Sequence, residues 1–227
     1  MTGIMQDPTP IEIQTVEEAV VNALRNEIVQ LRLSPGTRLR MAGIAEWAGV
    51  SLTPARQALR RLEAEGLVIS HVRLGSRVAP LTREDGEVVM TVCNALERRL
   101  IAIGVPKLTD EDLDEVARLS EWRENAVQSG DEEGLIKASF QLRDLVYQRA
   151  DRPHLYREAM AWRQRQQRYL RYARHAVTDS GVEFGREFTA FTTACLARDS
   201  TAAQAALQHI EERLQQWLQG MLEVKSE

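Results

Sequence analysis

The chain has 227 residues, 44% of them hydrophobic, and a formal net charge of −4. This length leaves room for one large or two modest domains, each able to bury a core. No apolar run approaches the length needed to cross a bilayer, and no basic start followed by an apolar stretch marks a secretory signal. We therefore expect a cytoplasmic protein without a membrane partner.

The first helix is predicted over residues 15–31. Its apolar residues recur at helical spacing: Val16, Val20, Leu24, Ile28 and Leu31. The sequence SPGTRL then predicts a turn that ends this helix.

Two short helices joined by a tight turn are predicted next. The first ends at Gly49, a residue suited to the positive φ of a helix–helix turn. The second begins after Ser51, a good N-cap, and has Pro54 in its first turn, where an N–H would have no partner. Its apolar stripe consists of Ala55, Ala58, Leu59 and Leu62, and its other side of Thr53, Arg56, Gln57 and Arg60. Such a pair of helices places its second helix in the DNA major groove.

A small hairpin is predicted after Gly66. Residues 67–71 have the pattern of a strand, Arg73 to Gly75 turn the chain, and residues 76–79 return it. Together with the preceding helices, this hairpin predicts a winged helix-turn-helix DNA-binding domain over residues 13–80.

The charge of this segment differs from that of the whole chain. Residues 38–77 contain seven arginines and three glutamates, a local charge of +4. Phosphate groups require such a surplus, because releasing their counterions supplies much of the sequence-independent affinity. Mixed Arg and Glu side chains can also form an ordinary solvated helix face. The order of helix, turn, helix and Gly-tipped hairpin favours DNA binding.

A second domain is predicted over residues 81–223. The sequence APLTRED, with Thr82 as a helix cap, marks its start. No strand pattern follows, and cap and breaker signals near residues 104–112, 128–133, 150–153, 178–181 and 197–200 divide the segment into about six helices. The predicted fold is therefore mostly α, with a small β-hairpin in the first domain and an all-α helical bundle in the second.

The two cysteines, Cys93 and Cys195, lie far apart in sequence and within predicted helices. Cytosolic disulfides are rare, which favours buried reduced thiols. A redox switch is the alternative.

The run SPGTRLRMAGIAEWAGVSLTPARQALRRLEAEGLV and its wing resemble the DNA-binding domain of GntR-type bacterial transcription regulators. The helical remainder resembles the FCD effector domain of the FadR branch, and the six-helix count resembles the smaller VanR-like variant. The resemblance covers nearly the whole chain from about Thr15 onward. It implies contacts to a double-stranded DNA operator from Arg40, Ser51, Thr53, Arg56, Gln57, Arg60, Arg73 and Gly75. The family commonly has an arginine where this chain has Leu52.

Many members of this branch bind a divalent metal with an Asp and three His residues. The corresponding positions here are Ser139, Arg143, Phe188 and His209, of which only His209 keeps its ligand type. A single histidine cannot hold a metal against water, and Phe188 has no lone pair. We therefore predict no metal and no other cofactor.

A direct effector site is our hypothesis for the second domain. The family often has an arginine where this chain has Cys93, four residues before a retained Glu97, whereas an arginine stands here at position 143. A guanidinium can bind a carboxylate bidentately. The expected pocket is made of Cys93, Glu97, Ser139, Arg143, Tyr169, Phe188 and His209, and takes a small organic-acid effector. In the alternative, Arg143 pairs with Glu97 or another acid, Phe188 fills the pocket and no effector exists.

The predicted helix after residue 153 is rich in arginine and aromatic residues. Its arginines are Arg163, Arg165, Arg168, Arg171 and Arg174. This run is typical of an outward, solvated face, although nucleic-acid binding or a place in the pocket is open as well.

These observations predict a homodimeric repressor that binds a palindromic operator and is released by its effector. No GxSxG, HExxH, Walker, CxxC or GxGxxG motif suggests an enzyme. The alternative is a helical dimerisation or interaction protein that has lost sequence-specific DNA binding, which Leu52 keeps open.

Overall fold

The computed structural model describes residues 15–71, 73, 75–174 and 183–223. The chain divides into two compact units, the first ending at Pro80 and the second starting at Leu81. None of the described helices is long and apolar enough to span a membrane.

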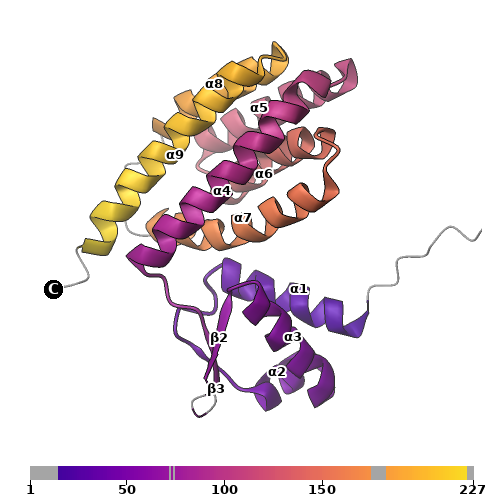
Figure 1. The fold of residues 1–227 in the computed structure, drawn as a ribbon, viewed down its shortest axis with the longest axis vertical. Helices are drawn as coiled ribbons and strands as arrows, with labels where there is room; N and C mark the ends of the chain where they lie inside the picture. The colour runs from indigo at the N-terminus through magenta and orange to yellow at the C-terminus, as the bar shows by residue number, and fades with distance from the viewer. Residues whose placement is uncertain (1–14, 72, 74, 175–182, 224–227) are drawn as a thin grey trace, which may run out of the picture. The chain divides into compact units, whose positions relative to one another are not determined.

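The first unit consists of three helices and a small sheet (Figure 1). Its elements are α1 (Val16–Val29), β1 (Arg38–Leu39), α2 (Met41–Ala48), α3 (Leu52–Ala64), β2 (Val68–His71) and β3 (Gly75–Val78). The strands are antiparallel in the order β1-β3-β2, and His71 of β2 pairs with Gly75 of β3. The predicted winged helix-turn-helix is confirmed, with the addition of β1. A strand of two residues, such as β1, is too short to show an alternating pattern in the sequence.

The turn between α2 and α3 has the expected geometry. Gly49 caps α2 in the left-handed region with φ 65°, which favours glycine because it has no Cβ. Ser51 occupies the N-cap position of α3, but its side chain makes no capping hydrogen bond. The Ser51 hydroxyl is therefore not used in capping the helix that it precedes.

The core of the first unit fixes the orientation of α3. Ala55, Ala58 and Leu62 of α3 are fully buried in one cluster with Leu24 and Ile28 of α1. Small side chains on α3 let the two helices approach closely. Because this stripe faces inward, the opposite side of α3 faces solvent.

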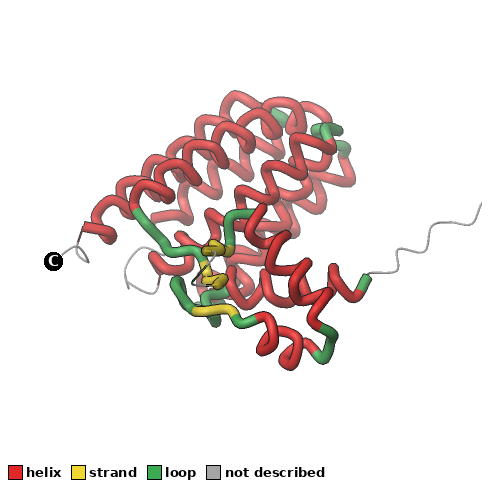
Figure 2. The backbone as a smooth tube through the Cα atoms, turned by 60° about the horizontal axis from the view of Figure 1, so that its bottom comes forward, coloured by secondary structure: helices red, strands yellow, loops and turns green. Residues whose placement is uncertain are grey.

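The second unit is a helical bundle, in which the described residues form six α-helices (Figure 2). They are α4 (Arg83–Gly104), α5 (Asp110–Ser129), α6 (Glu132–Arg149), α7 (Pro153–Arg174), α8 (Glu183–Leu196) and α9 (Ser200–Glu223), with a 3₁₀ turn η1 (Val105–Lys107) after α4. The mostly α fold is thus confirmed. Four of the five expected helix breaks coincide with observed ones, and the break at 178–181 lies outside the described residues.

Both cysteines belong to the interior of the second unit. Cys93 and Cys195 are buried and unbridged. Burial raises the pKa of Cys195 to about 12 and raises that of Cys93 well above its ordinary value. Both side chains are therefore held as neutral thiols, which are poor nucleophiles.

Gly104 permits the close approach of α4 and α6. A Cβ at Gly104 would overlap the backbone carbonyl oxygen of Val146, whereas a Cβ at Gly43 of α2 would meet nothing closer than 4.0 Å. We expect Gly104→Ala to lower the free energy of unfolding by about 2 kcal/mol or more, because backbone must move. Gly43→Ala, the control, should leave stability unchanged or raise it by up to about 1 kcal/mol. Thermal unfolding followed by circular dichroism distinguishes the two, and equal melting temperatures would contradict the packing described.

Candidate nucleic-acid interface and charged core

The exposed side of α3 presents polar groups that have no partner among the described residues. Its exposed side chains include Thr53, Arg56, Gln57 and Arg60, with Ser51 at the cap. Neither Arg56 nor Arg60 forms a hydrogen bond or ion pair with another described residue. Their guanidinium groups are therefore available to an external acceptor.

Glu65, the acidic residue that directly follows α3, is already paired with two arginines. Arg25 of α1 binds Glu65 with an Nη2–Oε1 distance of 2.6 Å, and Arg61 lies 3.7 Å from the same oxygen. Because Glu65 is held by these two arginines, it does not neutralise Arg56 or Arg60. On α3, Arg61 thus lies on the side that approaches Glu65, whereas Arg56 and Arg60 lie on the other side and pair with no described residue.

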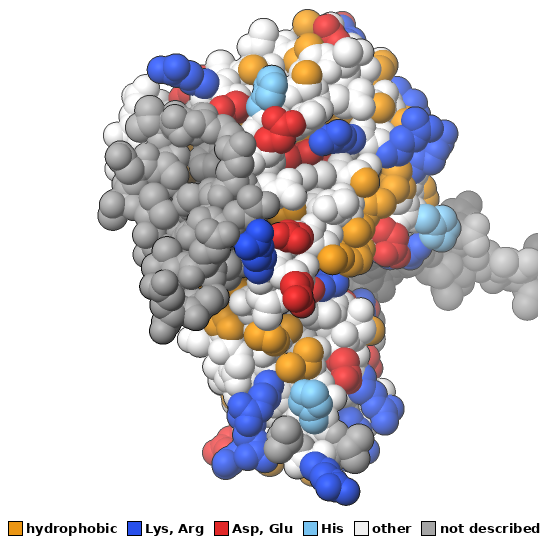
Figure 3. All heavy atoms as spheres, turned by 60° about the vertical axis from the view of Figure 1, so that its left-hand side comes forward, with side chains coloured by type: hydrophobic (Ala, Val, Ile, Leu, Met, Phe, Trp, Pro, Cys, Tyr) orange, Lys and Arg blue, Asp and Glu red, His pale blue; other side chains and the backbone are white. Residues whose placement is uncertain are grey.

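The wing and the start of α2 add further exposed groups. Arg73 and Gly75 at the hairpin tip are exposed, and so is Arg40, the residue that precedes α2. Gly75 has φ 75°, the left-handed region, which the tight turn requires. Figure 3 shows several Lys or Arg side chains on the face of the first unit in view, and all of them are arginines because this unit has no lysine.

The second unit encloses a carboxylate shared by two arginines. Glu97 of α4 is fully buried, and Arg163 of α7 donates to its Oε1 at 3.2 Å. Arg143 of α6 lies 3.6 Å from its Oε2. Cys93 lies close enough for the charge of Glu97 to raise its pKa further. The structure thus contains the Arg143–Glu97 pair of our alternative reading.

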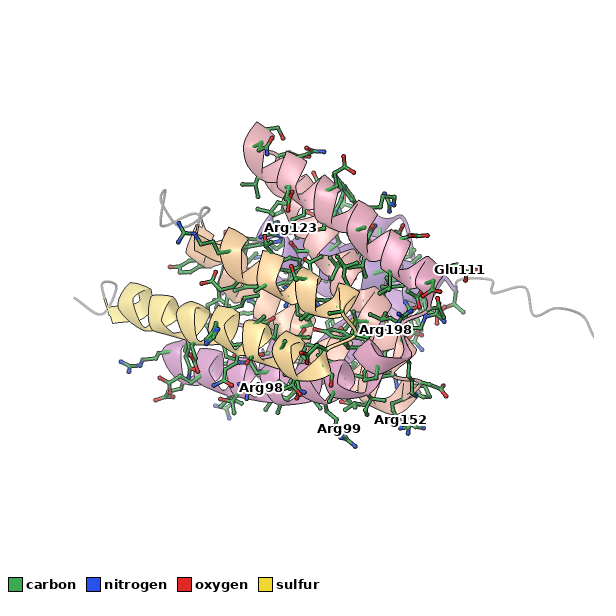
Figure 4. The ribbon with its side chains drawn as sticks, turned by 90° about the horizontal axis from the view of Figure 1, so that it is seen from above. Arg98, Arg99, Glu111, Arg123, Arg152 and Arg198 are labelled. Carbon is green, nitrogen blue, oxygen red and sulfur yellow. The ribbon has the colours of Figure 1, made fainter. Side chains whose placement is uncertain are left out.

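Ser139 and Phe188 are both engaged by Arg123 of α5, which the sequence analysis missed. Arg123 is buried, donates from Nε to Ser139 Oγ at 3.1 Å and lies 4.2 Å from the centre of the Phe188 ring. In Figure 4 it points between α5 and α8. A sequence signal existed, because Arg123 falls in the helical stripe of Val116, Leu119 and Ala126.

Two expected members of the pocket lie elsewhere. The Tyr169 hydroxyl donates to Asp85 Oδ2 at 2.7 Å and accepts from the Thr82 N–H at 3.3 Å, so it holds the first turn of α4. His209 of α9 is exposed. The inward position on α9 belongs to Glu211, which is buried and was not predicted. The seven expected pocket residues therefore do not form one cluster.

Glu211 is bound by Arg98 of α4, which lies between α4 and α9 (Figure 4). Arg98 donates to Glu211 Oε2 from Nη2 at 2.9 Å and from Nε at 3.2 Å, whereas the buried Oε1 has no hydrogen-bond partner. Burial raises the pKa of Glu211 to about 7, and the pairing with Arg98 offsets this only in part. Among nearby charges, Glu97 raises this pKa and Arg143 lowers it.

The arginines of α7 correct another expectation. Arg163 and Arg168 are buried, so this run does not form an outward, solvated face. Arg163 lies 4.7 Å from the centre of the Phe140 ring, and burial lowers the pKa of Arg168. Two of the arginines of α7 therefore lie inside the bundle and not on its surface.

A small cavity lies between α6 and α7. It is lined by Ser139, Phe140, Arg143, Arg163, Gln166 and Arg171, among others, and its volume is about 50 Å³. Pockets for drug-sized ligands span roughly 300–1,000 Å³. As it stands, this cavity suits water and is too small for an organic acid.

The residues at the four metal-ligand positions do not fit a divalent metal. Arg143 is a cation paired with Glu97, Phe188 has no lone pair and His209 is exposed. No group of three or more His, Cys, Asp or Glu side chains suited to a metal ion occurs in the described part of the chain.

Two family descriptions match the chain. "Bacterial regulatory proteins, gntR family" matches residues 16–78, and "FCD domain" matches residues 88–212, more than half of the chain. The chain belongs to the GntR family and carries an FCD domain. The resemblance found in the sequence is thus confirmed.

Relatives of this GntR-family chain include the HTH-type transcriptional regulator McbR of Escherichia coli (strain K12), 30% identical over 136 residues. That match covers 60% of this chain and 62% of McbR. A probable D-xylose utilization operon transcriptional repressor of Paenarthrobacter nicotinovorans is 39% identical over 83 residues, 37% of each chain. The matched parts span less than two thirds of these relatives.

Solved structures extend the likeness of this GntR-family chain to nearly its full length. The structure of E. coli McbR/YncC has a TM-score of 0.79 at 25% identity and covers 91% of this chain and 98% of that one. A GntR regulator from Rhodococcus sp. RHA1 has a TM-score of 0.70 at 20% identity, covers 90% and 97%, and shows the fold alone.

The raised pKa of Glu211 predicts a pH-dependent stability. The ordinary value of 4.5 applies to the unfolded chain and about 7 to the folded one, so the folded state binds this proton more tightly. The stabilisation is full below pH 4.5 and is lost as pH rises through 7. We expect the free energy of unfolding to fall by roughly 3 kcal/mol over this window on account of Glu211.

Urea unfolding of the full chain between pH 5 and pH 8 tests this. Glu211→Gln should reduce the slope, and the surface substitution Glu115→Gln should leave it unchanged. A slope that is the same in the wild type and Glu211→Gln would show that another group is responsible.

Proposed function

We propose that this GntR-family protein represses transcription as a homodimer bound to a palindromic DNA operator in the cytoplasm. The proposal rests on two exposed arginines of α3, Arg56 and Arg60, which lie opposite the buried stripe and pair with none of the residues that the structure describes. The repressor role is supported by the relative that is named as a probable D-xylose utilization operon transcriptional repressor. Regulation, not catalysis, is also what the names of the relatives describe.

Each exposed group suits a part of the duplex. The guanidinium of Arg56 matches the O6 and N7 acceptors of guanine in the major groove. Ser51 and Thr53 stand at the amino end of α3, where backbone N–H groups and the helix dipole attract phosphate. Arg73 and Gly75 at the wing tip suit the minor groove, and Arg40 and Arg60 add positive charge. The local charge of +4 supplies the sequence-independent part of the affinity.

Two chains on one operator follow from the size of this surface. A single winged unit contacts few base pairs, and a two-fold dimer doubles the contacts on a palindromic site. We assign dimerisation and effector binding to residues 81–223, and DNA binding to residues 13–80.

The second candidate function is that of an interaction protein without sequence-specific DNA binding. The observation that favours it is Leu52, an exposed apolar side chain at the start of α3. The two functions predict different responses to the loss of Arg56.

We expect Arg56→Ala to weaken specific binding by at least about tenfold, since a bidentate contact to guanine contributes about 1–3 kcal/mol at each half-site. Fluorescence anisotropy with DNA from upstream of its own gene measures this, at several salt concentrations. The wild-type affinity should fall steeply with salt. Arg118→Ala, at a surface arginine of α5 that pairs with Glu115, is the matched control and should bind as the wild type does. Equal affinity of wild type and Arg56→Ala would favour the interaction protein.

We further propose that a small organic acid releases the operator by binding at Arg143. One carboxylate, Glu97, faces two guanidinium groups there, Arg143 and Arg163. A second anion could take the place of Glu97 on Arg143, the longer of the two pairs, while Arg163 keeps Glu97. The present cavity would have to open, which makes the affinity depend on the cost of separating α6 from α7.

Thermal-shift screening and isothermal titration with mono-, di- and tricarboxylic acids test this site. We expect at least one acid to raise the melting temperature of the wild type and to lower its DNA affinity, because the ligand binds the folded state. Arg143→Ala should lose both responses, and Arg118→Ala should keep them. If no acid acts on the wild type, or if one acts equally on Arg143→Ala, Arg143 is only the structural partner of Glu97.

A further inference from the structure

Leu52 is an apolar side chain on an otherwise hydrogen-bonding surface. It is the first residue of α3, its exposed fraction is 49%, and it is outside the buried cluster of the first unit. The other exposed residues at this end of α3 are Ser51, Thr53, Arg56 and Gln57. Each of these can donate or accept a hydrogen bond, and Leu52 cannot.

An exposed leucine alone means little, since apolar atoms make up much of any protein surface. The position of Leu52 relative to Arg56 is what distinguishes it from other exposed apolar residues. It precedes Arg56 by four residues, so the two side chains lie one above the other on the same face of α3. The amino end of the second helix is the part of a helix-turn-helix that contacts base edges. A group beside Arg56 therefore reaches the base pair next to the one that Arg56 contacts.

The major-groove edges of the bases offer few groups with which a leucine side chain can make an apolar contact. Guanine, adenine and cytosine present acceptors or amino donors there, and only thymine presents a methyl group. Leucine against a polar edge would displace water without replacing its hydrogen bonds, which costs free energy. Leucine against a thymine methyl buries apolar surface from both partners.

We propose that Leu52 reads the 5-methyl group of a thymine in each half-site, next to the base pair contacted by Arg56. Leu52 is then a specificity-determining residue of the DNA interface and not a sign that DNA binding has been lost. This inference rests on the proposed DNA-binding function.

The test uses a base analogue that removes the methyl group and nothing else. An operator is first selected from random duplex DNA with the full-length protein, and each thymine is then replaced in turn by deoxyuridine. At one thymine position per half-site we expect the wild-type affinity to fall about fourfold, the effect of one buried methyl-sized group, and about fifteenfold when both half-sites are changed.

Leu52→Ala assigns the effect to this side chain. The variant should bind the thymine and deoxyuridine forms of that position within about twofold of each other, since its side chain ends at Cβ. Val16→Ala is the matched control, because Val16 is an exposed apolar residue of the same unit, on α1, with 59% exposure. It should keep the full wild-type ratio.

The outcomes separate this inference from the proposed function. If a specific operator is found and every deoxyuridine form binds like its thymine form, or if Leu52→Ala keeps the wild-type ratio, the role of Leu52 is wrong and DNA binding stands. If no specific operator is selected, the proposed function fails and the role of Leu52 fails with it.

Discussion

The packing of α3 on α1 is the constraint on which the DNA interface depends. Ala55, Ala58 and Leu62 are fully buried, and this stripe fixes the rotation of α3 about its axis. Once that rotation is set, Arg56 and Arg60 must face solvent. Neither arginine forms an ion pair with another described residue, and Glu65 is bound to Arg25 and Arg61. The hydrophobic contact thus determines the direction of the arginines, and the ion pairs of Glu65 keep its carboxylate away from them.

In the second unit, unlike on α3, arginines pair with buried carboxylates. Glu97 lies against two arginines, and Glu211 and Asp112 bind one each, so every buried carboxylate among the described residues faces a guanidinium. Of the four positions compared with the family's metal ligands, one is an arginine, Arg143, and Arg123 contacts two others, Ser139 and Phe188. The chain therefore supplies positive charge there from its own side chains. Breaking one such pair is costly, because it leaves a buried charge without a partner.

Local patterns predicted the helices, the Gly49 turn and the hairpin because each depends on neighbours in sequence. They failed where distant segments meet. β1 is visible only through its pairing with β3. The helical stripe of α5 could have placed Arg123 inside the bundle, but its partners Ser139 and Phe188 come from other helices. On α9 the apolar spacing of Ala203, Ala206, Leu207 and Ile210 defines an inward face that includes Glu211 and leaves His209 exposed.

The same helix that carries Arg163 to Glu97 also carries Tyr169 to the start of α4. Tyr169 is buried, and its hydroxyl binds Asp85 and both backbone groups of Thr82, which closely follows the boundary of the first unit. Its ring also lies close to Gly86, where a Cβ would approach it to 3.0 Å. A ligand that moved α7 would therefore also displace the first turn of α4, because Tyr169 is tightly packed against that turn. Packed side chains of this kind can carry coupling between a pocket and a distant site, and α7 contributes such contacts.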